Sequence, residues 1–164
     1  MTQSATTVHA SAVLVGARAV LIRGPSGAGK SRLALALIEA ARAGTLRFAR
    51  LVGDDRVHLD PAHGRLLVRP ADALVGLIEV RGLGIRRLDH EPSAVVGLVV
   101  DLAAADAERL PQTERQHAVI AGISLPRLAI AAGEEALPAV LAVLTSARLE
   151  GAVLGLGLDL GPAS

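Results

Sequence analysis

The chain has 164 residues and no cysteine, which is enough for one domain with a sizeable core and excludes disulfide frameworks and thiolate metal sites. Hydrophobic residues make up 51% of the sequence but aromatic residues only 1%, and the formal net charge is +1, so we expect an aliphatic core and no nucleic-acid binding. No apolar run reaches the roughly 18 residues that suggest a membrane span, and the N-terminus lacks the form of a secretory signal, so we expect a cytoplasmic location.

Apolar runs in the first third of the chain predict two strands followed by a helix. Strands are expected at 8–15 and 19–23, separated by a tight turn at 16–18. A helix is expected at 30–42, because apolar side chains recur there at helical spacing and Gly44 follows as a typical stop. The segment between the second strand and the helix is rich in glycine.

Beyond residue 44 the pattern predicts mostly short strands. They are expected at 50–52, 56–60, 65–69, 77–80, 95–102 and 125–130, and the second and third of them form a hairpin. A short helix is expected at 103–110 and a closing helix at 137–149. The tail at 151–164 is rich in Gly and Leu and lacks capping signals, so we expect it to be disordered.

The glycine-rich segment has the pattern G-x-x-x-x-G-K-[ST], which is typical of a phosphate-binding loop. Its glycines let backbone N–H groups approach phosphate oxygens, and the following helix directs its positive N-terminus at the same anion. Lys30 is the only lysine in the chain, and its compact ammonium reaches between β- and γ-phosphates as a planar guanidinium cannot. The residues expected to contact ATP are Gly24, Pro25, Ser26, Gly27, Ala28, Gly29, Lys30, Ser31 and Arg32.

Missing motifs narrow the class of phosphate-loop protein. The chain has no asparagine, hence no Asn-Lys-x-Asp guanine motif, and no Leu-Ser-Gly-Gly-Gln segment of a transporter ATPase. It is also short for a motor or a helicase. Small kinases remain, so residues 1–150 are interpreted as a single catalytic domain with the α/β P-loop kinase fold, a central mixed β-sheet flanked by helices. The alternative interpretation of the motif alone is a glycine-rich turn that binds nothing.

Two further segments carry candidate chemistry. Asp54 and Asp55 follow an apolar strand, the usual place for an acid that orders Mg²⁺ in such proteins. Because successive side chains at a strand end point apart, one carboxylate can face the metal and the other an attacking hydroxyl; a solvated turn is the alternative. The segment Glu-Val-Arg-Gly-Leu-Gly-Ile at 79–85 places Glu79 and Arg81 at another strand end, and alone it favours an ordinary strand and loop with a surface ion pair.

Taken together, these segments closely resemble the catalytic domain of HPr kinase/phosphorylase, over about residues 8–110. That family has a Gly-x-Ser-Gly-x-Gly-Lys-Ser loop, a strand ending in Asp-Asp and a Glu-Ile-Arg-Gly-Leu-Gly-Ile signature, and the same order is found here. The resemblance implies a kinase that uses ATP and Mg²⁺ to phosphorylate a serine of the phosphocarrier protein HPr. In many members it also implies the reverse phosphorolysis with inorganic phosphate, and a homo-oligomer is possible.

Carried over residue by residue, the resemblance implies a catalytic set and a metal-binding set. Asp55 is the general base that accepts the serine proton, and the acid in the reverse direction. The implied catalytic residues are Asp55, His9, Lys30, Arg81 and Arg109. The implied metal-binding residues are Ser31, Glu79 and Asp54. For His9, on an apolar strand, a purely structural role is the alternative.

The chain departs from the family pattern in three places. The first strand begins almost at Met1, so the long N-terminal domain of typical members is not expected. Arg32 stands where the family commonly has Glu. The family's Val-Arg-Pro-Gly-Arg-Asn loop, linked with the reverse reaction, is matched poorly by 124–129, which keeps only Arg127. We therefore expect weak phosphorolysis.

Two other functions compete with a protein-serine kinase. A small-molecule kinase could use the same loop, although no dedicated lid sequence is present. A nucleotide-dependent regulatory module with little turnover would need the loop and the metal but no positioned base, so Asp55 and Glu79 argue against it. Selectivity for the nucleotide base is expected to be poor, because Phe48 is the only aromatic ring.

Overall fold

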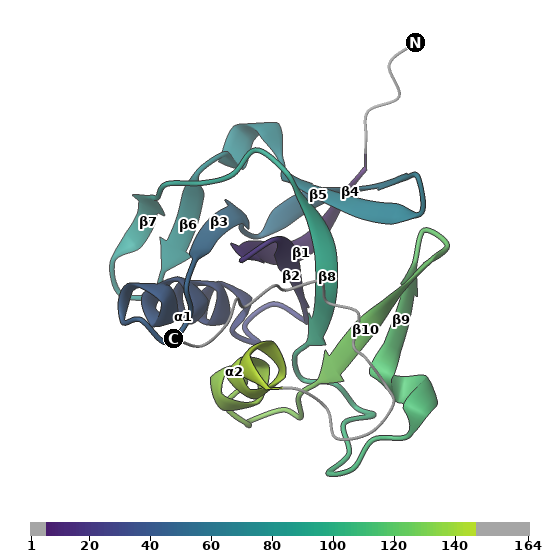
Figure 1. Cartoon of the computed structure of the whole chain (residues 1–164). Helices are drawn as coiled ribbons and strands as arrows, with labels where there is room; N and C mark the ends of the chain where they lie inside the picture. Colours follow the sequence, from purple (N-terminus) through teal and green to yellow (C-terminus); the bar gives the residue numbers. More distant parts are fainter. Residues whose placement is uncertain (1–5, 147–164) are drawn as a thin grey trace.

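The computed structural model describes residues 6–146 of the chain as twelve strands and helices with two short 3₁₀ turns (Figure 1). The first six, in chain order, are β1 (Thr7–Val15), β2 (Arg18–Arg23), α1 (Lys30–Arg42), β3 (Ala49–Gly53), β4 (Arg56–Ala62) and β5 (Arg65–Pro70). The remaining six are β6 (Leu77–Val80), β7 (Gly84–Arg87), β8 (Ala94–Asp101), β9 (His117–Ile120), β10 (Ile123–Ala129) and α2 (Leu137–Thr145). The 3₁₀ turns are Asp72–Leu74 and Thr113–Gln116.

The strand pairings close into a ring. β2, β1, β4, β5 and β8 pair in that order, and β8 pairs back with β2 in parallel. β3 joins the other strands through β1, and the β9–β10 hairpin extends from β8, whereas β6 and β7 form a separate two-stranded sheet. The parallel pairing puts the carboxyl ends of β2, β8 and β10 at one edge, where the glycine-rich loop begins.

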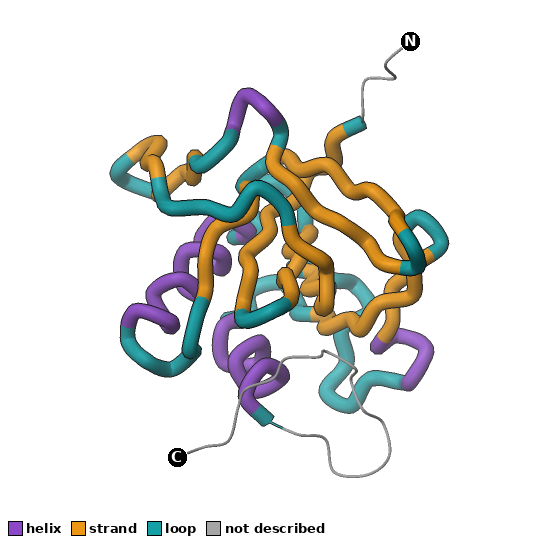
Figure 2. The backbone as a smooth tube through the Cα atoms, turned by 45° about the horizontal axis from the view of Figure 1, so that its top comes forward, coloured by secondary structure: helices purple, strands orange, loops and turns teal. Residues whose placement is uncertain are grey.

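Two aliphatic clusters fill the molecule. One lies within the strand ring and includes Leu21, Val57 and Leu66, all fully buried. The other lies between the strands and both helices, which sit side by side below the sheet (Figure 2). Leu33 and Leu37 of α1 and Val140 of α2 belong to it, while Phe48 is 37% exposed. The expected aliphatic core is therefore confirmed.

Most of the predicted elements are confirmed. The strands expected before residue 103, the hairpin at 56–69 and the helix at 30–42 are found within a few residues of their predicted bounds, and the mixed sheet with helices agrees with an α/β fold. Strands β7 and β9 were not predicted. The closing helix ends at Thr145 rather than continuing through Ser146, and residues 147–149 and the expected disordered tail at 151–164 lie outside the described residues.

The helix expected at 103–110 is wrong. The segment forms turns instead, and Ala103 adopts a left-handed backbone with φ of 52°. The N–H of Ala104 donates to the carbonyl oxygen of Ile130 at 2.9 Å, and Arg127 binds the carboxylate of Asp106 at 2.8 and 2.9 Å. These long-range contacts outweigh the helix propensity of an alanine-rich segment, which is a weak local preference.

No helix in the described part of the chain is both long enough and apolar enough to span a membrane.

Candidate active site

The phosphate loop joins the end of β2 to the start of α1, as the motif predicts. Gly29 caps the helix with a left-handed backbone, φ 99°, which a residue with a side chain adopts only with strain. At Gly24 the limit is space, because a Cβ there would lie 3.1 Å from the Cβ of Leu102 and 3.2 Å from its carbonyl oxygen. The loop therefore needs glycine at both ends, and it rests on the residue that follows β8.

Lys30 is held inside this loop. Its side chain is only 6% exposed, and Nζ donates to the carbonyl oxygens of Gly24 at 2.8 Å and Pro25 at 3.1 Å. Burial lowers the pKa of the Lys30 ammonium from its ordinary value, while the negative charges of Asp55 and Asp54 oppose that change. An ammonium that is poorly hydrated and faces carbonyl oxygens fits the oxygens of a bound phosphate.

Asp54 is the centre of the site. It lies just after β3, is 3% exposed, and accepts hydrogen bonds from the hydroxyl of Ser11 at 2.6 Å and that of Ser31 at 2.8 Å. The backbone N–H of Glu79 also donates to it, at 3.2 Å. One buried carboxylate thus ties together β1, the start of α1 and β6. Ser11 was missed by the sequence analysis, although a serine within the apolar run of the first strand was a visible signal.

The arrangement fits a metal that is shared with phosphates. The hydroxyl hydrogen of Ser31 is committed to Asp54, which leaves its oxygen lone pairs to accept or to ligate. Within residues 6–146 there is no group of three or more His, Asp or Glu side chains suited to hold a metal. Mg²⁺ in phosphoryl-transfer sites takes only one or two protein ligands and completes its shell with phosphates and water, so this donor set suffices.

Asp55 points away from its neighbour, as expected for adjacent residues at a strand end. Its side chain is 63% exposed, and its Oδ1 lies 2.8 Å from Nε2 of His9. The backbone of Asp55 is left-handed, with φ of 68°, and its N–H donates to the hydroxyl of Ser11 at 3.4 Å. Left-handed backbone at a non-glycine residue is uncommon and is concentrated at functional sites. The structure thus presents one carboxylate to solvent beside an imidazole.

Among residues 6–146, the side chains of Glu79, Arg81, Arg109 and Arg32 make no hydrogen bond or ion pair with this centre. Glu79 contacts Asp54 only through its backbone, and its carboxylate is exposed. Arg81 begins the turn between β6 and β7, and Arg109 lies in the segment after β8; both are exposed. Arg32 is exposed on α1 and lies 3.6 Å from the carboxylate of Glu135. Their assigned roles stay predictions.

An ion network that was not predicted lies next to the glycine-rich loop, at the ends of β2, β8 and β10. Asp101, at the end of β8, accepts from Arg23 at 2.7 and 2.9 Å and from Arg127 at 2.6 Å. Arg127 also donates to both carboxylate oxygens of Asp106. Burial alone would raise the pKa of Asp101, but the hydrogen bonds and charges of the two arginines outweigh it and lower that pKa. The network fixes Arg23, the residue before Gly24.

We expect Asp101→Asn to lower the free energy of unfolding by about 2–3 kcal/mol, because it leaves the mostly buried Arg127 with half its negative partners. The matched control is Asp60→Asn, which breaks the more exposed pair with Arg69 and should cost under about 1 kcal/mol. Urea unfolding of both variants at neutral pH measures the difference. Equal losses would show that the network adds no more than a surface ion pair.

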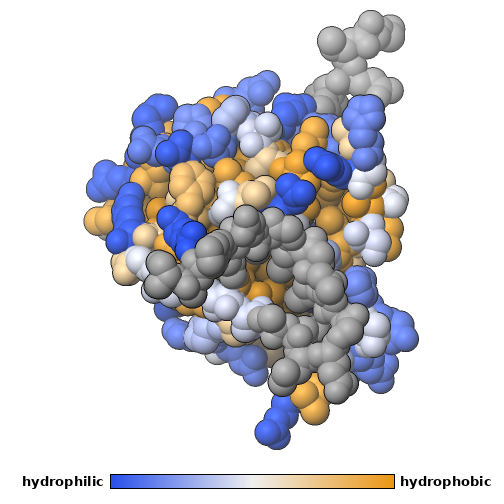
Figure 3. All heavy atoms as spheres, viewed as in Figure 1, coloured by the Kyte–Doolittle hydropathy of each residue, from blue (hydrophilic) through white to orange (hydrophobic). Residues whose placement is uncertain are grey.

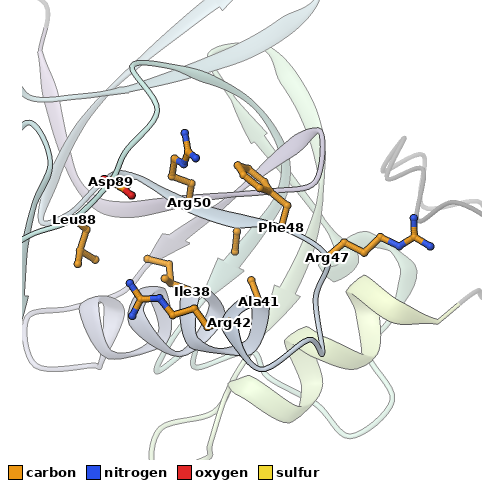
Figure 4. A pocket seen from close by; sticks show the side chains of 9 residues that line it. Ile38, Ala41, Arg42, Arg47, Phe48, Arg50, Leu88 and Asp89 are labelled. Atoms are coloured by element: carbon orange, nitrogen blue, oxygen red, sulfur yellow. The ribbon is translucent and has the colours of Figure 1, made fainter.

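A separate cavity of about 250 Å³ lies at the opposite end of α1 (Figure 4). Arg42, Arg50 and Phe48 are among its lining residues. Two of its arginines are already paired, Arg42 with Glu39 at 2.5 Å and Arg50 with Glu91 at 2.9 Å, and no residue of the glycine-rich loop lines it. Arg50 also lies 5.2 Å from the centre of the Phe48 ring. This cavity is therefore not the phosphate site.

A family model described as the HPr Serine kinase C-terminal domain matches residues 2–149. The chain belongs to this family. HPr kinase/phosphorylase of Clostridium beijerinckii is 44% identical over 80 residues, which cover 49% of this chain and 24% of the relative. That of Geobacillus thermodenitrificans is 36% identical over 136 residues, 76% of this chain and 42% of the relative. The resemblance inferred from the three motifs is confirmed, and the chain spans less than half the length of these relatives.

The fold agrees with the family. A solved structure of the Hpr(Ser) kinase/phosphatase from Coxiella burnetii is similar with a TM-score of 0.67 and 23% sequence identity. The similarity covers 85% of this chain and 88% of that one. At this identity the comparison shows a shared fold.

Proposed function

We propose that this chain is an ATP-dependent kinase that phosphorylates a serine of HPr. The proposal rests mainly on one observation: the glycine-rich loop is hydrogen-bonded to Asp54, and the residue after Asp54 presents an exposed carboxylate. Ser31 of the loop binds Asp54, and the adjacent Asp55 faces solvent beside His9. Membership of the HPr kinase family and the names of the curated relatives support HPr as the acceptor.

Different groups of the chain would bind the triphosphate and the metal. The backbone N–H groups before α1, the helix N-terminus and Lys30 bind and orient the triphosphate. Ser31 and Asp54, with Glu79 close by, would hold Mg²⁺, which when bound supplies charge neutralisation at the phosphate oxygens. The ammonium of Lys30 is buried within the loop and held there by two carbonyl oxygens, which it would exchange for oxygens of the bound phosphate.

Asp55 is placed to handle the proton. Its carboxylate is exposed beside His9, so it can accept the proton of the seryl hydroxyl as the seryl oxygen bonds to phosphorus and the bridging oxygen leaves. Nε2 of His9, 2.8 Å away, holds the carboxylate in one orientation. In the reverse direction the same carboxyl group returns its proton to the departing serine oxygen.

The decisive experiment incubates the chain with labelled ATP, Mg²⁺ and purified HPr, followed by mapping of the labelled residue. Label on one serine of HPr, lost in an Asp55→Asn variant, is the expected result. Label on a small molecule from a metabolite mixture, but not on HPr, would favour a small-molecule kinase. Tight Mg-ATP binding with no transfer to any acceptor would favour a regulatory module.

We expect phosphorolysis to run at less than about a tenth of the forward rate. Inorganic phosphate and phosphoserine repel each other, so the reverse direction needs additional cations to hold both anions. Arg127 cannot provide this help, because it is 12% exposed and its guanidinium is bonded to Asp101 and Asp106. Both directions are measured on one preparation at matched enzyme and millimolar phosphate. Equal rates would show that other cations hold the phosphate.

A further inference from the structure

The β6–β7 hairpin carries an unusual outer surface. Leu83 and Ile85 are 62% and 60% exposed, and the same short segment contains Arg81, Arg86 and Arg87, all exposed. None of these three guanidinium groups has a hydrogen-bond or ion-pair partner within residues 6–146. On the left of Figure 3, where β7 lies in Figure 1, strongly hydrophilic and apolar residues lie next to one another.

The register of the hairpin separates an anchored face from an open one. Ile78, paired with Arg86, is 1% exposed and belongs to the apolar cluster between the strands and both helices. Successive residues point to opposite faces, so Glu79 and its partner Ile85 lie on the other side, as do Leu77 and Arg87. The inner face holds the hairpin on the body of the protein, and on the outer face Ile85 and Arg87 are exposed.

The hairpin is continuous with the candidate active site. The N–H of Glu79, the residue opposite Ile85, donates to the buried carboxylate of Asp54. The base of the hairpin is closed by the N–H of Leu88, which donates to the carbonyl oxygen of Gly76 at 2.8 Å. A protein that rests on Ile85 is therefore one strand pairing away from Glu79, whose N–H is bonded to Asp54, the neighbour in sequence of the proposed base Asp55.

Single exposed apolar residues are ordinary on protein surfaces, and Leu110 and Val119 are examples here, at 85% and 70% exposure. The hairpin differs in two respects. Its two apolar side chains occur within three residues of each other, and the segment 77–87 contains three arginines but a single carboxylate, that of Glu79. Arginine next to aliphatic side chains is a composition that favours protein interfaces.

We propose that the outer face of the β6–β7 hairpin docks the protein that carries the acceptor serine. The matching surface on that protein is apolar and bordered by carboxylates, which pair with the guanidinium group of Arg87 on the same face. This inference rests on the proposed kinase function and adds how the acceptor is selected. Leu83, Ile85 and Arg87 contribute to binding of the protein, whereas Glu79 and Arg81 of the same hairpin keep the roles proposed for them at the metal and at the phosphoryl group.

The test compares two double variants of equal chemistry. Leu83→Ser with Ile85→Ser removes the apolar surface of the hairpin. Leu110→Ser with Val119→Ser is the control, because these residues are even more exposed and β9, which contains Val119, lies on the side of the molecule away from β7 (Figure 1). Each variant is titrated with purified HPr by calorimetry, which needs no turnover, and is then assayed for kcat and for KM of HPr. Mg-ATP affinity and sedimentation are measured on the same preparations.

The hairpin variant is expected to raise the dissociation constant and KM for HPr by about tenfold, with kcat and Mg-ATP affinity within about twofold of the parent chain. Arg87→Glu should raise the same KM, and added salt should reduce that effect. An unchanged KM and dissociation constant for HPr overturn the docking proposal, as does a change confined to Mg-ATP affinity or to self-association. A parent chain that transfers no phosphate to HPr overturns instead the proposed function.

Discussion

Lys30→Met is expected to weaken Mg-ATP binding at least about 100-fold without loss of fold. The ammonium that faces the carbonyl oxygens of Gly24 and Pro25 disappears, while methionine keeps most of the buried stem. Because burial lowers the pKa of Lys30, the folded chain holds this proton less tightly than the unfolded chain. The positive charge of Lys30 therefore lowers the free energy of unfolding at a pH below the folded-state pKa. Removing this charge should not make the fold less stable.

Calorimetric titration with Mg-ATP measures the affinity, and urea unfolding tests the fold. Arg42→Met is the matched control, since it removes a positive charge from the other end of the same helix and should leave Mg-ATP affinity within about twofold. If Lys30→Met bound Mg-ATP as the parent does, the segment from Gly24 to Ser31 would not be a phosphate site.

The phosphate loop was predictable because its geometry is encoded locally. The glycines, the lysine and the helix that follows are contiguous, and Gly29 and Lys30 lie where the motif places them. The two aspartates were also predictable, since a strand end turns neighbouring side chains apart. The structure adds which one is buried, namely Asp54 at 3% exposure, and this depends on the packing of β1 and α1 around it.

The features that were predicted wrongly or missed depend on contacts between segments that are distant in the sequence. The alanine-rich run at 103–110 has helix propensity, but the contacts of Ala104 and Asp106 with β10 and the residue after it hold it in turns. Arg23, Asp101 and Arg127 each stand at or near a strand end, and no local pattern indicates that they pair with one another. Only the parallel pairing of β2, β8 and β10 brings them together. A polar residue at the end of each of three apolar strands was the available signal.

Asp55→Asn is expected to lower kinase turnover by about a thousandfold while Mg-ATP affinity changes by less than about threefold. The amide has the volume of the carboxylate but cannot accept the serine proton. Asparagine, like aspartate, also tolerates the left-handed backbone at this position, φ 68°, so the loop should keep its shape. Alanine here would add strain and confuse the loss of a base with a distorted loop.

Glu79→Gln provides the contrast, because it changes another carboxylate of the same site without touching the proposed base. It should raise the Mg²⁺ concentration needed for half-maximal activity and leave turnover at saturating Mg²⁺ within about tenfold of the parent. Single-turnover transfer to HPr, measured at saturating Mg-ATP, separates the chemical step from binding. An Asp55→Asn chain that kept most of its single-turnover rate would assign the proton to another group, and His9, whose Nε2 lies 2.8 Å from Asp55, is the next candidate.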